Sequence, residues 1–282
     1  MVKKKLVFEK NGISMDGALL SNDAAAGIYN RLGMGPKGTK VIVRNLDTGN
    51  VQETHNKVLV AGAQWTASMH WGLDDIISLP SYNTDLRLDE PTDIVSTDKV
   101  RKIRLFCCGT NGCGVEQSQI YDVDYTKRIQ PQYMIPFRYQ KVDNDLSDAM
   151  RKTYFGRKTV DRQYYAYYFK KPSADAQMFA HYIDGTPLDG NLYNSQNKME
   201  AELYVETVLM VTKDDFRDYF INTTGINTAR MNQFSLCQAW EVTDKNGYKW
   251  YKDITPVTQV NIATEPLIDL TKGVEITYQT YY

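Results

Sequence analysis

The stretch KMEAELYVETVLMVT, residues 198–212, alternates apolar and polar side chains more regularly than any other part of the chain. At a period of two, one face carries Ala201, Leu203, Val205, Leu209 and Val211, and the other carries Glu202, Tyr204 and Glu206. Successive side chains of a β-strand point to opposite faces of the sheet, so this pattern predicts a long strand that is buried on one side. No catalytic motif in the sequence has a signal of comparable strength.

Turn sequences divide much of the remaining chain into further strands. Residues 39–45 and 51–60 flank Asp-Thr-Gly-Asn, and residues 234–242 and 248–253 flank Asp-Lys-Asn-Gly, so each pair predicts a β-hairpin. Other strands are expected at 100–106, 119–125, 132–139, 162–170, 178–183 and 274–282. Strands joined by turns rather than by long helices imply antiparallel sheets.

The chain is therefore expected to be mainly β: an antiparallel β-sandwich or jelly-roll-like fold with a few short helices and long loops. Its 282 residues suffice for a single large β-rich unit spanning 1–282. A helical segment at 144–152 interrupts the strands, so two lobes, 1–140 and 160–282, with a helical seam at 141–159 are an alternative. Residues 73–97 contain two prolines and many small polar side chains, which predicts an extended loop.

The composition excludes several classes of partner. A formal net charge of −1 argues against direct, sequence-specific nucleic acid binding, which normally requires an excess of Lys and Arg. No apolar run approaches the length of a membrane span, and the N-terminal sequence lacks the apolar core of a signal peptide. Four cysteines are too few for a disulfide scaffold in a chain of this size, so we expect synthesis in a reducing cytoplasm.

Two short motifs match known signatures but lack their structural context. The sequence GMGPKG at 33–38 fits G-x-G-x-x-G, yet here an expected helix at 21–32 precedes the glycines and a strand follows, which inverts the order of a dinucleotide site. Asp47-Thr48-Gly49 matches the tripeptide of aspartic proteases, which need two carboxylates that share a proton. Because the triplet lies at an expected hairpin tip, we interpret it as turn chemistry.

Metal and acid–base candidates are equally sparse. Cys107, Cys108 and Cys113 lie beside glycines, whereas Cys237 lies alone in an expected strand, so the spacing does not indicate a zinc site, although it leaves metal binding open. Asp122 and Asp124 would face the same side of the strand expected at 119–125, as a cation site or a glycosidase pair requires, but a solvated strand face is a far more common reason for such a pair. The three histidines, His55, His70 and His181, accompany no recognised catalytic motif. We therefore assign no catalytic, cofactor-binding or metal-binding residue and expect no cofactor.

Tyrosine is the compositional outlier, with 20 residues against 9 Phe and 4 Trp. The densest cluster consists of Tyr164, Tyr165, Tyr167 and Tyr168, in the strand expected at 162–170. Tyrosine combines a large contact area with a polar tip, which suits interfaces between subunits and also surfaces on which sugars or bases stack. These four residues are the candidate interface or ligand surface.

Several segments resemble structural proteins of tailed-bacteriophage virions. They are HNKVLVAGAQWTASMHWGL at 55–73, MIPFRYQ at 134–140, YFGRK at 154–158 and LTKGVEITYQTYY at 270–282. The resemblance implies a β-rich subunit of a ring or lattice that needs no cofactor, is made in the host cytoplasm and resides in the virion. Its partners would be copies of itself and other virion structural proteins.

These observations predict a non-enzymatic structural subunit of a phage neck, tail or baseplate that forms a symmetric oligomer. Long polar loops and exposed sheet edges agree with this function, because neighbouring copies can order the loops and cover the edges. Two alternatives remain open. One is a carbohydrate- or receptor-binding module that uses the strand containing Tyr164–Tyr168, and the other is a glycan-degrading hydrolase that uses Asp122 or Asp124.

Overall fold

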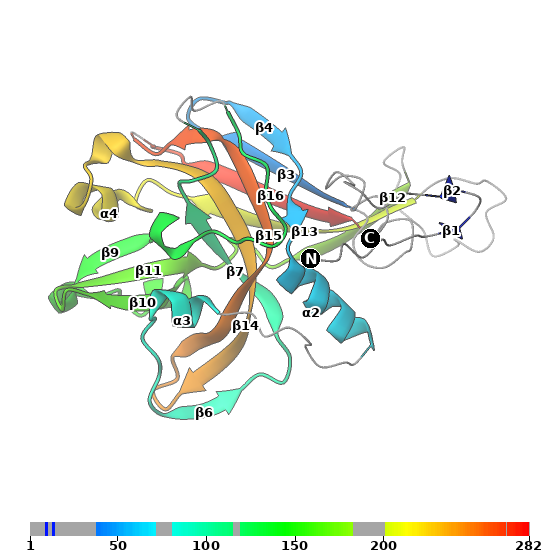
Figure 1. Ribbon diagram of the computed structural model, residues 1–282. Helices are drawn as coiled ribbons and strands as arrows, with labels where there is room; N and C mark the ends of the chain where they lie inside the picture. Colours follow the sequence, from blue (N-terminus) through cyan, green and yellow to red (C-terminus); the bar gives the residue numbers. More distant parts are fainter. Residues whose placement is uncertain are drawn as a thin grey trace, which may run out of the picture.

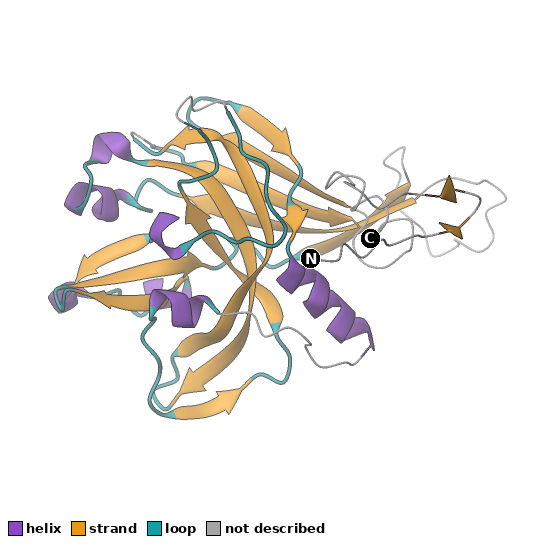
Figure 2. Cartoon of the chain, viewed as in Figure 1, coloured by secondary structure: helices purple, strands orange, loops and turns teal. Residues whose placement is uncertain are grey.

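A computed structural model describes residues 9–10, 13–14, 38–71, 81–114, 119–182, 201–268 and 270–281. It confirms the predicted fold class: the chain is mainly β, its sheets are antiparallel, and the helices are short and peripheral (Figures 1 and 2). The helix expected at 21–32 and the glycines at 33 and 35 lie outside the described residues. Apart from one two-residue ribbon, formed by β1 (Glu9–Lys10) and β2 (Ile13–Ser14), the described strands belong to two sheets.

The smaller sheet contains the strand predicted from residues 198–212. Its order is β12 (Gln177–Tyr182), β13 (Ala201–Val211), β16 (Val274–Tyr281), β3 (Gly38–Asn45) and β4 (Val51–Thr54). The pairing of β3 with β4 confirms the first predicted hairpin. β13 lies one strand from the edge of this sheet, because β12 is the outermost strand, and therefore the stretch with the strongest sequence signal is not the centre of the fold.

The larger sheet is built on the second predicted hairpin, formed by β14 (Arg230–Asp244) and β15 (Lys249–Pro266). Its order is β10 (Tyr154–Val160), β11 (Tyr164–Lys170), β7 (Lys102–Gly109), β14, β15 and β5 (Lys57–Val58). Three short strands pair alongside: β6 (Ile94–Thr97) with β14, β8 (Met134–Ile135) with β7, and β9 (Arg138–Lys141) with β11.

Helices of one to three turns lie at the margins of these sheets. The α-helices are α2 (Val60–Trp71), α3 (Tyr82–Leu86) and α4 (Arg217–Asn222). Single 3₁₀ turns occur at η1 (Pro131–Tyr133), η2 (Val142–Asn144), η3 (Met150–Lys152) and η4 (Ile226–Thr228). The segment at 61–71, whose sequence fits either a helix or an irregular crossing, is thus helical.

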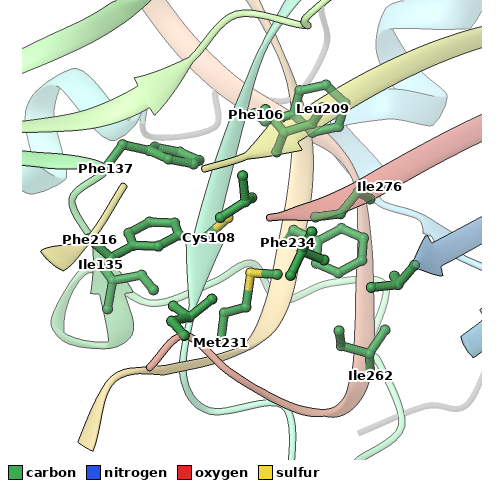
Figure 3. Close-up of a cluster of buried hydrophobic side chains, with 14 of the residues drawn as sticks. Phe106, Cys108, Ile135, Phe137, Leu209, Phe216, Met231, Phe234, Ile262 and Ile276 are labelled. Carbon is green, nitrogen blue, oxygen red and sulfur yellow. The ribbon is translucent and has the colours of Figure 1, made fainter. Parts of the chain in front are cut away.

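The main hydrophobic core lies between the two sheets. Phe106 and Phe234 of the larger sheet pack against Tyr278 of the smaller one, with ring centroids 5.6 and 5.9 Å apart. Aliphatic side chains from both sheets, including Leu209, Ile262 and Ile276, complete the layer (Figure 3). This apolar contact between opposing faces makes the architecture a sandwich.

A second, smaller core lies on the opposite face of the larger sheet. Leu105 and Cys107 point into it from β7, while Phe106 and Cys108 point into the main core, so this strand is buried on both faces. α3 covers part of the second core, and its Tyr82 ring packs on Phe169 with centroids 5.8 Å apart. The larger sheet is consequently covered on both sides near its centre.

Several local predictions are wrong. The described part of the loop expected at 73–97 contains α3 and β6, because Ser81 caps α3 and residues 94–97 pair with β14. Residues 119–125 form only an isolated bridge through Ile120. The glycine in residues 154–158 predicts the end of the helical segment at 144–152, but these residues begin β10, where Gly156 adopts a φ of +64°.

The alternative of two lobes, 1–140 and 160–282, does not follow the sheets. Strands from the first part pair with strands from the second, β3 with β16 and β7 with β14, and side chains from both parts share the main core. The expected seam at 141–159 contains η2 and η3, and its last residues belong to β10 of the larger sheet.

Candidate functional site: the tyrosine strand, its groove and the strand arm

The predicted tyrosine strand is β11, an interior strand with β10 on one side and β9 on the other. The ring of Tyr164 stacks on Tyr139, with centroids 4.7 Å apart and an interplanar angle of 19°. Tyr168 packs against the second core, and burial raises the pKa of its hydroxyl to about 12. This face of β11 is therefore largely occupied by contacts within the chain.

The other two tyrosines of β11 lie on the opposite face, beneath arginine side chains. The guanidinium of Arg157 lies 4.4 Å from the centroid of the Tyr165 ring. Tyr167 is only 4% exposed and donates a hydrogen bond to Asp145. Burial, followed by this contact with Asp145, raises the pKa of the Tyr167 hydroxyl far above its ordinary value. The four tyrosines thus do not form one open platform, but Tyr167 forms part of the wall of a groove.

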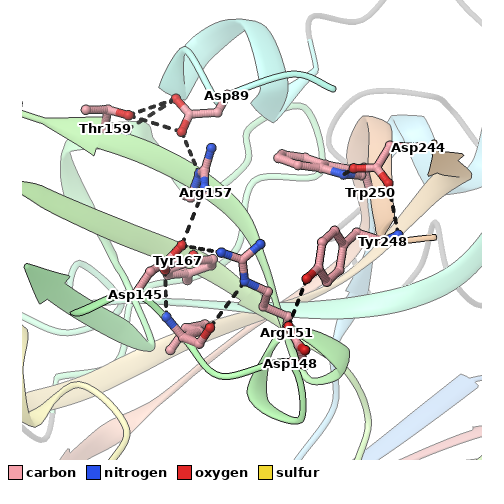
Figure 4. Close-up of polar contacts among 11 residues, drawn as sticks. Asp89, Asp145, Asp148, Arg151, Arg157, Thr159, Tyr167, Asp244, Tyr248 and Trp250 are labelled. Carbon is pink, nitrogen blue, oxygen red and sulfur yellow. Dashed lines mark hydrogen bonds and ion pairs between the residues drawn. The ribbon is translucent and has the colours of Figure 1, made fainter. Parts of the chain in front are cut away.

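This groove lies between β10 and the tip of the β14–β15 hairpin. One wall carries Arg157 of β10 and Arg151 of η3, and the other carries Tyr248 and Trp250 of the hairpin (Figure 4). Sequence reasoning singled out none of these four residues. Tyr248 and Trp250 do follow the predicted turn at 244–247, and as alternate residues of the strand expected at 248–253 they share a face.

Carboxylates hold both arginines of the groove in place. Arg157 Nε donates to Asp89 Oδ2 over 2.7 Å, and Arg151 Nη2 donates to Asp145 Oδ2 over 2.6 Å. Asp89 also accepts from the hydroxyl and backbone N–H of Thr159 on β10. Burial lowers the pKa of Arg157, but the hydrogen bond and charge of Asp89 outweigh this effect and raise it, so the guanidinium is held charged.

A buried ion pair lies at the end of β11 that is remote from Tyr164. Lys170 Nζ lies 2.7 Å from Asp215 Oδ2, and their side chains are 6% and 0% exposed. The same carboxylate accepts from the backbone N–H and hydroxyl of Thr212 and from the hydroxyl of Tyr154. Both oxygens of this buried anion accept hydrogen bonds and one of them meets an ammonium group, and such contacts are the condition under which an interior charge is tolerated.

The remaining acidic candidates have structural surroundings. Asp122 and Asp124 lie in an irregular segment rather than in a strand, so the geometry expected for a paired-carboxylate site is absent from these described residues. Asp124 accepts from the hydroxyl and backbone N–H of Thr126, which lowers its pKa. Asp47 accepts backbone N–H groups from Thr271, Lys272 and Gly273 and so ties the β3–β4 turn to the segment before β16.

The histidines and cysteines likewise make structural contacts. His55 Nδ1 lies 2.8 Å from the carbonyl oxygen of Thr39, and the His181 ring packs against Tyr204; the side chain of His70 lies outside the described residues. Cys107 and Cys237 are buried with Sγ atoms 3.7 Å apart, and Cys113 donates to the carbonyl of Ile262. Burial raises the pKa of Cys108, so its thiol is neutral. Within the described residues, no three His, Cys, Asp or Glu side chains gather as metal ligands would.

A second candidate surface lies at the opposite end of the molecule from the hairpin tip. β12 and the adjoining ends of β13 and β16 extend beyond the larger sheet, and we call this extension the strand arm (Figure 1). On one face of the arm, the rings of Phe179, Tyr204 and Tyr281 lie in a row, with centroids 5.1 and 5.2 Å apart. On the other face, Met178 is 70% exposed and Leu203 is 37% exposed.

No protein-family model, curated protein or solved structure matches this chain. Among the described residues, no helix combines the length and apolar character that crossing a bilayer requires.

Proposed function

We propose that this chain is a non-enzymatic structural subunit of a tailed-bacteriophage particle, from the neck, tail or baseplate region, and that it forms a symmetric oligomer. Its partners are copies of itself and other virion structural proteins. It is synthesised in the host cytoplasm and resides in the virion. The observation that carries the proposal is the strand arm, whose apolar face extends past the larger sheet (Figure 1) and keeps Met178 and Leu203 exposed among the described residues.

The uncovered face continues the face that forms the core. Leu209 and Val211 of β13 are fully buried between the sheets, and Leu203, on the same face, is 37% exposed. Met178 of β12 pairs with Val205 of β13 and extends this apolar surface to the sheet edge. Leaving a large apolar side chain in water instead of burying it costs about 1.5–3 kcal/mol, so a partner that covers several such side chains gains substantial binding energy.

The arm also has a sheet edge, at β12, with which no described strand pairs on its outer side. Within the described residues, β12 pairs with β13 alone, so the backbone groups on its other side have no strand partner. A strand from another copy can pair with such an edge, because backbone hydrogen bonds do not depend on sequence. An edge strand beside an apolar face favours contact between identical copies, since each arm supplies both features.

The association of the full chain in solution tests this proposal. We expect multi-angle light scattering after size exclusion to give a defined multiple of the 32.3 kDa chain mass at micromolar concentration. The double variant Met178→Asp/Leu203→Asp should shift the protein to the single-chain mass, because burying unpaired carboxylates in an interface costs several kcal/mol. Val95→Asp is the matched control, since Val95 is 66% exposed on β6, outside the arm, and this variant should associate like the wild type.

Two results would contradict the proposal. One is a wild-type chain that stays at 32.3 kDa up to about 100 μM together with its absence from purified particles by mass spectrometry. The other is an oligomer that the arm variant leaves intact, which would place the interface elsewhere.

A further inference from the structure

The groove beside β10 has no part in the proposed assembly. It lies at the tip of the β14–β15 hairpin, whereas the strand arm extends from the other end of the molecule (Figure 1). Its walls combine aromatic rings, guanidinium groups and carboxylates. The chemistry of each wall limits what can bind there.

The aromatic wall is rigid. Trp250 Nε1 donates to Asp244 Oδ2 over 3.0 Å, and the Tyr248 hydroxyl donates to Asp148 Oδ1 over 2.9 Å (Figure 4). Asp244 also accepts the backbone N–H groups of Asn246 and Tyr248, so the same carboxylate fixes the turn and the indole ring. Both rings are only partly buried. Because their orientations are set before a ligand arrives, binding would not have to restrict their side-chain rotations.

The opposite wall presents hydrogen-bonding groups that are also fixed. Arg157 lies between the rings of Tyr165 and Trp250, at 4.4 and 5.5 Å from their centroids, and Arg151 lies 5.0 Å from the Tyr248 ring centroid. Each guanidinium uses part of its donor set on Asp89 or Asp145. Among the contacts of the described residues, Arg157 Nη2 and Arg151 Nη1 have no hydrogen-bond acceptor.

Charge pairing in the groove disfavours an anionic ligand. Each of its three cations already has a carboxylate partner: Arg157 has Asp89, Arg151 has Asp145 and Lys249 has Glu241. A phosphate or sulfate site would leave positive charge unpaired to meet the anion. A neutral, polyhydroxylated ring instead needs both donors and acceptors beside an apolar face, and fixed guanidinium and carboxylate groups beside Trp250 provide them.

We propose that this groove binds a glycan through a neutral pyranose unit. The C–H groups of the sugar pack on the exposed parts of Trp250 and Tyr248 that Arg157 and Arg151 leave uncovered, and its hydroxyl groups donate to Asp89 and accept from the two guanidinium groups. The walls lie on segments that pair within the larger sheet or flank it, so the site is formed by one copy of the chain. The glycan-binding proposal is therefore independent of the proposed assembly.

Binding of the full-length protein to an array of neutral and anionic oligosaccharides, followed by calorimetric titration of the best ligand, tests this proposal. We expect binding to neutral glycans, with Trp250→Ala weakening the affinity at least tenfold. Arg157→Lys should also weaken it, because lysine cannot reproduce the planar donor set of arginine. The matched control is Trp240→Ala, on the same hairpin but outside the groove, where Arg101 lies 5.8 Å from the indole centroid; it should bind like the wild type.

Circular dichroism and thermal unfolding of each variant separate a lost ligand contact from a lost fold. The proposal is overturned by an array on which the wild type binds no glycan. It is also overturned by a titration in which Trp250→Ala and Trp240→Ala bind equally well. Binding restricted to sulfated or phosphorylated glycans, and abolished by moderate salt, would likewise overturn it, because it would indicate an anion site.

Discussion

The buried pair of Lys170 and Asp215 offers a quantitative test of how the end of β11 is held. In the Lys170→Met variant, the aliphatic part of the side chain remains but the ammonium group is removed. The Asp215 carboxylate then keeps its hydrogen bonds from Thr212 and Tyr154 but loses Lys170, its ion-pair partner among the described residues, at a site with 0% side-chain exposure. Removing one partner of a buried ion pair costs about 3–5 kcal/mol, because the other charge stays buried without compensation.

Thermal unfolding measures this cost. At roughly 2–4 °C per kcal/mol, the midpoint of Lys170→Met should fall by about 6–20 °C. Asp215→Asn should also destabilise the protein, and the double variant should lose less than the sum of the two single variants, because it contains no uncompensated charge. Lys40→Met is the control: Lys40 pairs with the largely exposed Glu53, so we expect a change below about 1 kcal/mol. A loss below about 1 kcal/mol for Lys170→Met, or strictly additive variants, would refute the reasoning.

Two further substitutions test local geometry. Gly156→Ala should lower the free energy of unfolding by roughly 2–4 kcal/mol in chemical denaturation. The reason is that φ is +64° at this position and the new Cβ would lie 2.3 Å from Phe169 Cδ2. A change below about 1 kcal/mol would contradict this close packing. Asp47→Asn should lower the thermal midpoint at pH 7, because the hydrogen bond from the Thr271 hydroxyl, followed by those from backbone N–H groups, lowers the pKa of Asp47 below its ordinary 3.8. A lowered folded-state pKa stabilises the protein above the unfolded-state value, so the difference between wild type and variant should shrink as the pH falls from about 4 to 2; a difference independent of pH would be the contrary result.

The fold class could be predicted because its determinants are local. The two hairpins with turns at 47–50 and 244–247 contain the residues that tight turns require, and both form with the expected partners. The segments predicted wrongly depend on distant contacts. Residues 94–97, Ile-Val-Ser-Thr, follow a stretch rich in Pro, Asp, Ser and Thr that suggests a loop, yet they form β6 because β14 extends far enough to pair with them. Residues 154–158 contain a glycine that suggests an ending, but Gly156 continues a strand at a position where Phe169 leaves no room for a side chain.

The groove could not be found from the sequence because it joins distant segments. Arg157 and Asp89 are 68 residues apart, and Tyr248 and Asp148 are 100 residues apart. The tyrosine cluster did direct attention to β11, but composition does not show which face of an interior strand is open. Tyr164 is covered by Tyr139, whereas Tyr167 lines the groove. The side chains that the neighbouring strands place over each face decide this: Tyr139 of β9 lies on Tyr164, and Arg157 of β10 lies over Tyr165.

The stretch at 198–212 shows that predicting a buried strand face differs from predicting what covers that face. Alternation in a sequence indicates that one face of a strand avoids water, but it does not say what covers that face. In β13 the alternation continues past the larger sheet: Val211 and Leu209 are buried in the main core, and Leu203 is 37% exposed. Large side chains scattered on a surface need no explanation, but an apolar face that is continuous with a core and ends at an edge without a described partner strand combines two features that favour association. If another copy covers this face, the pattern describes an interface along its first half and a core along its second, and the arm variant Met178→Asp/Leu203→Asp should lose association while the core it adjoins stays folded.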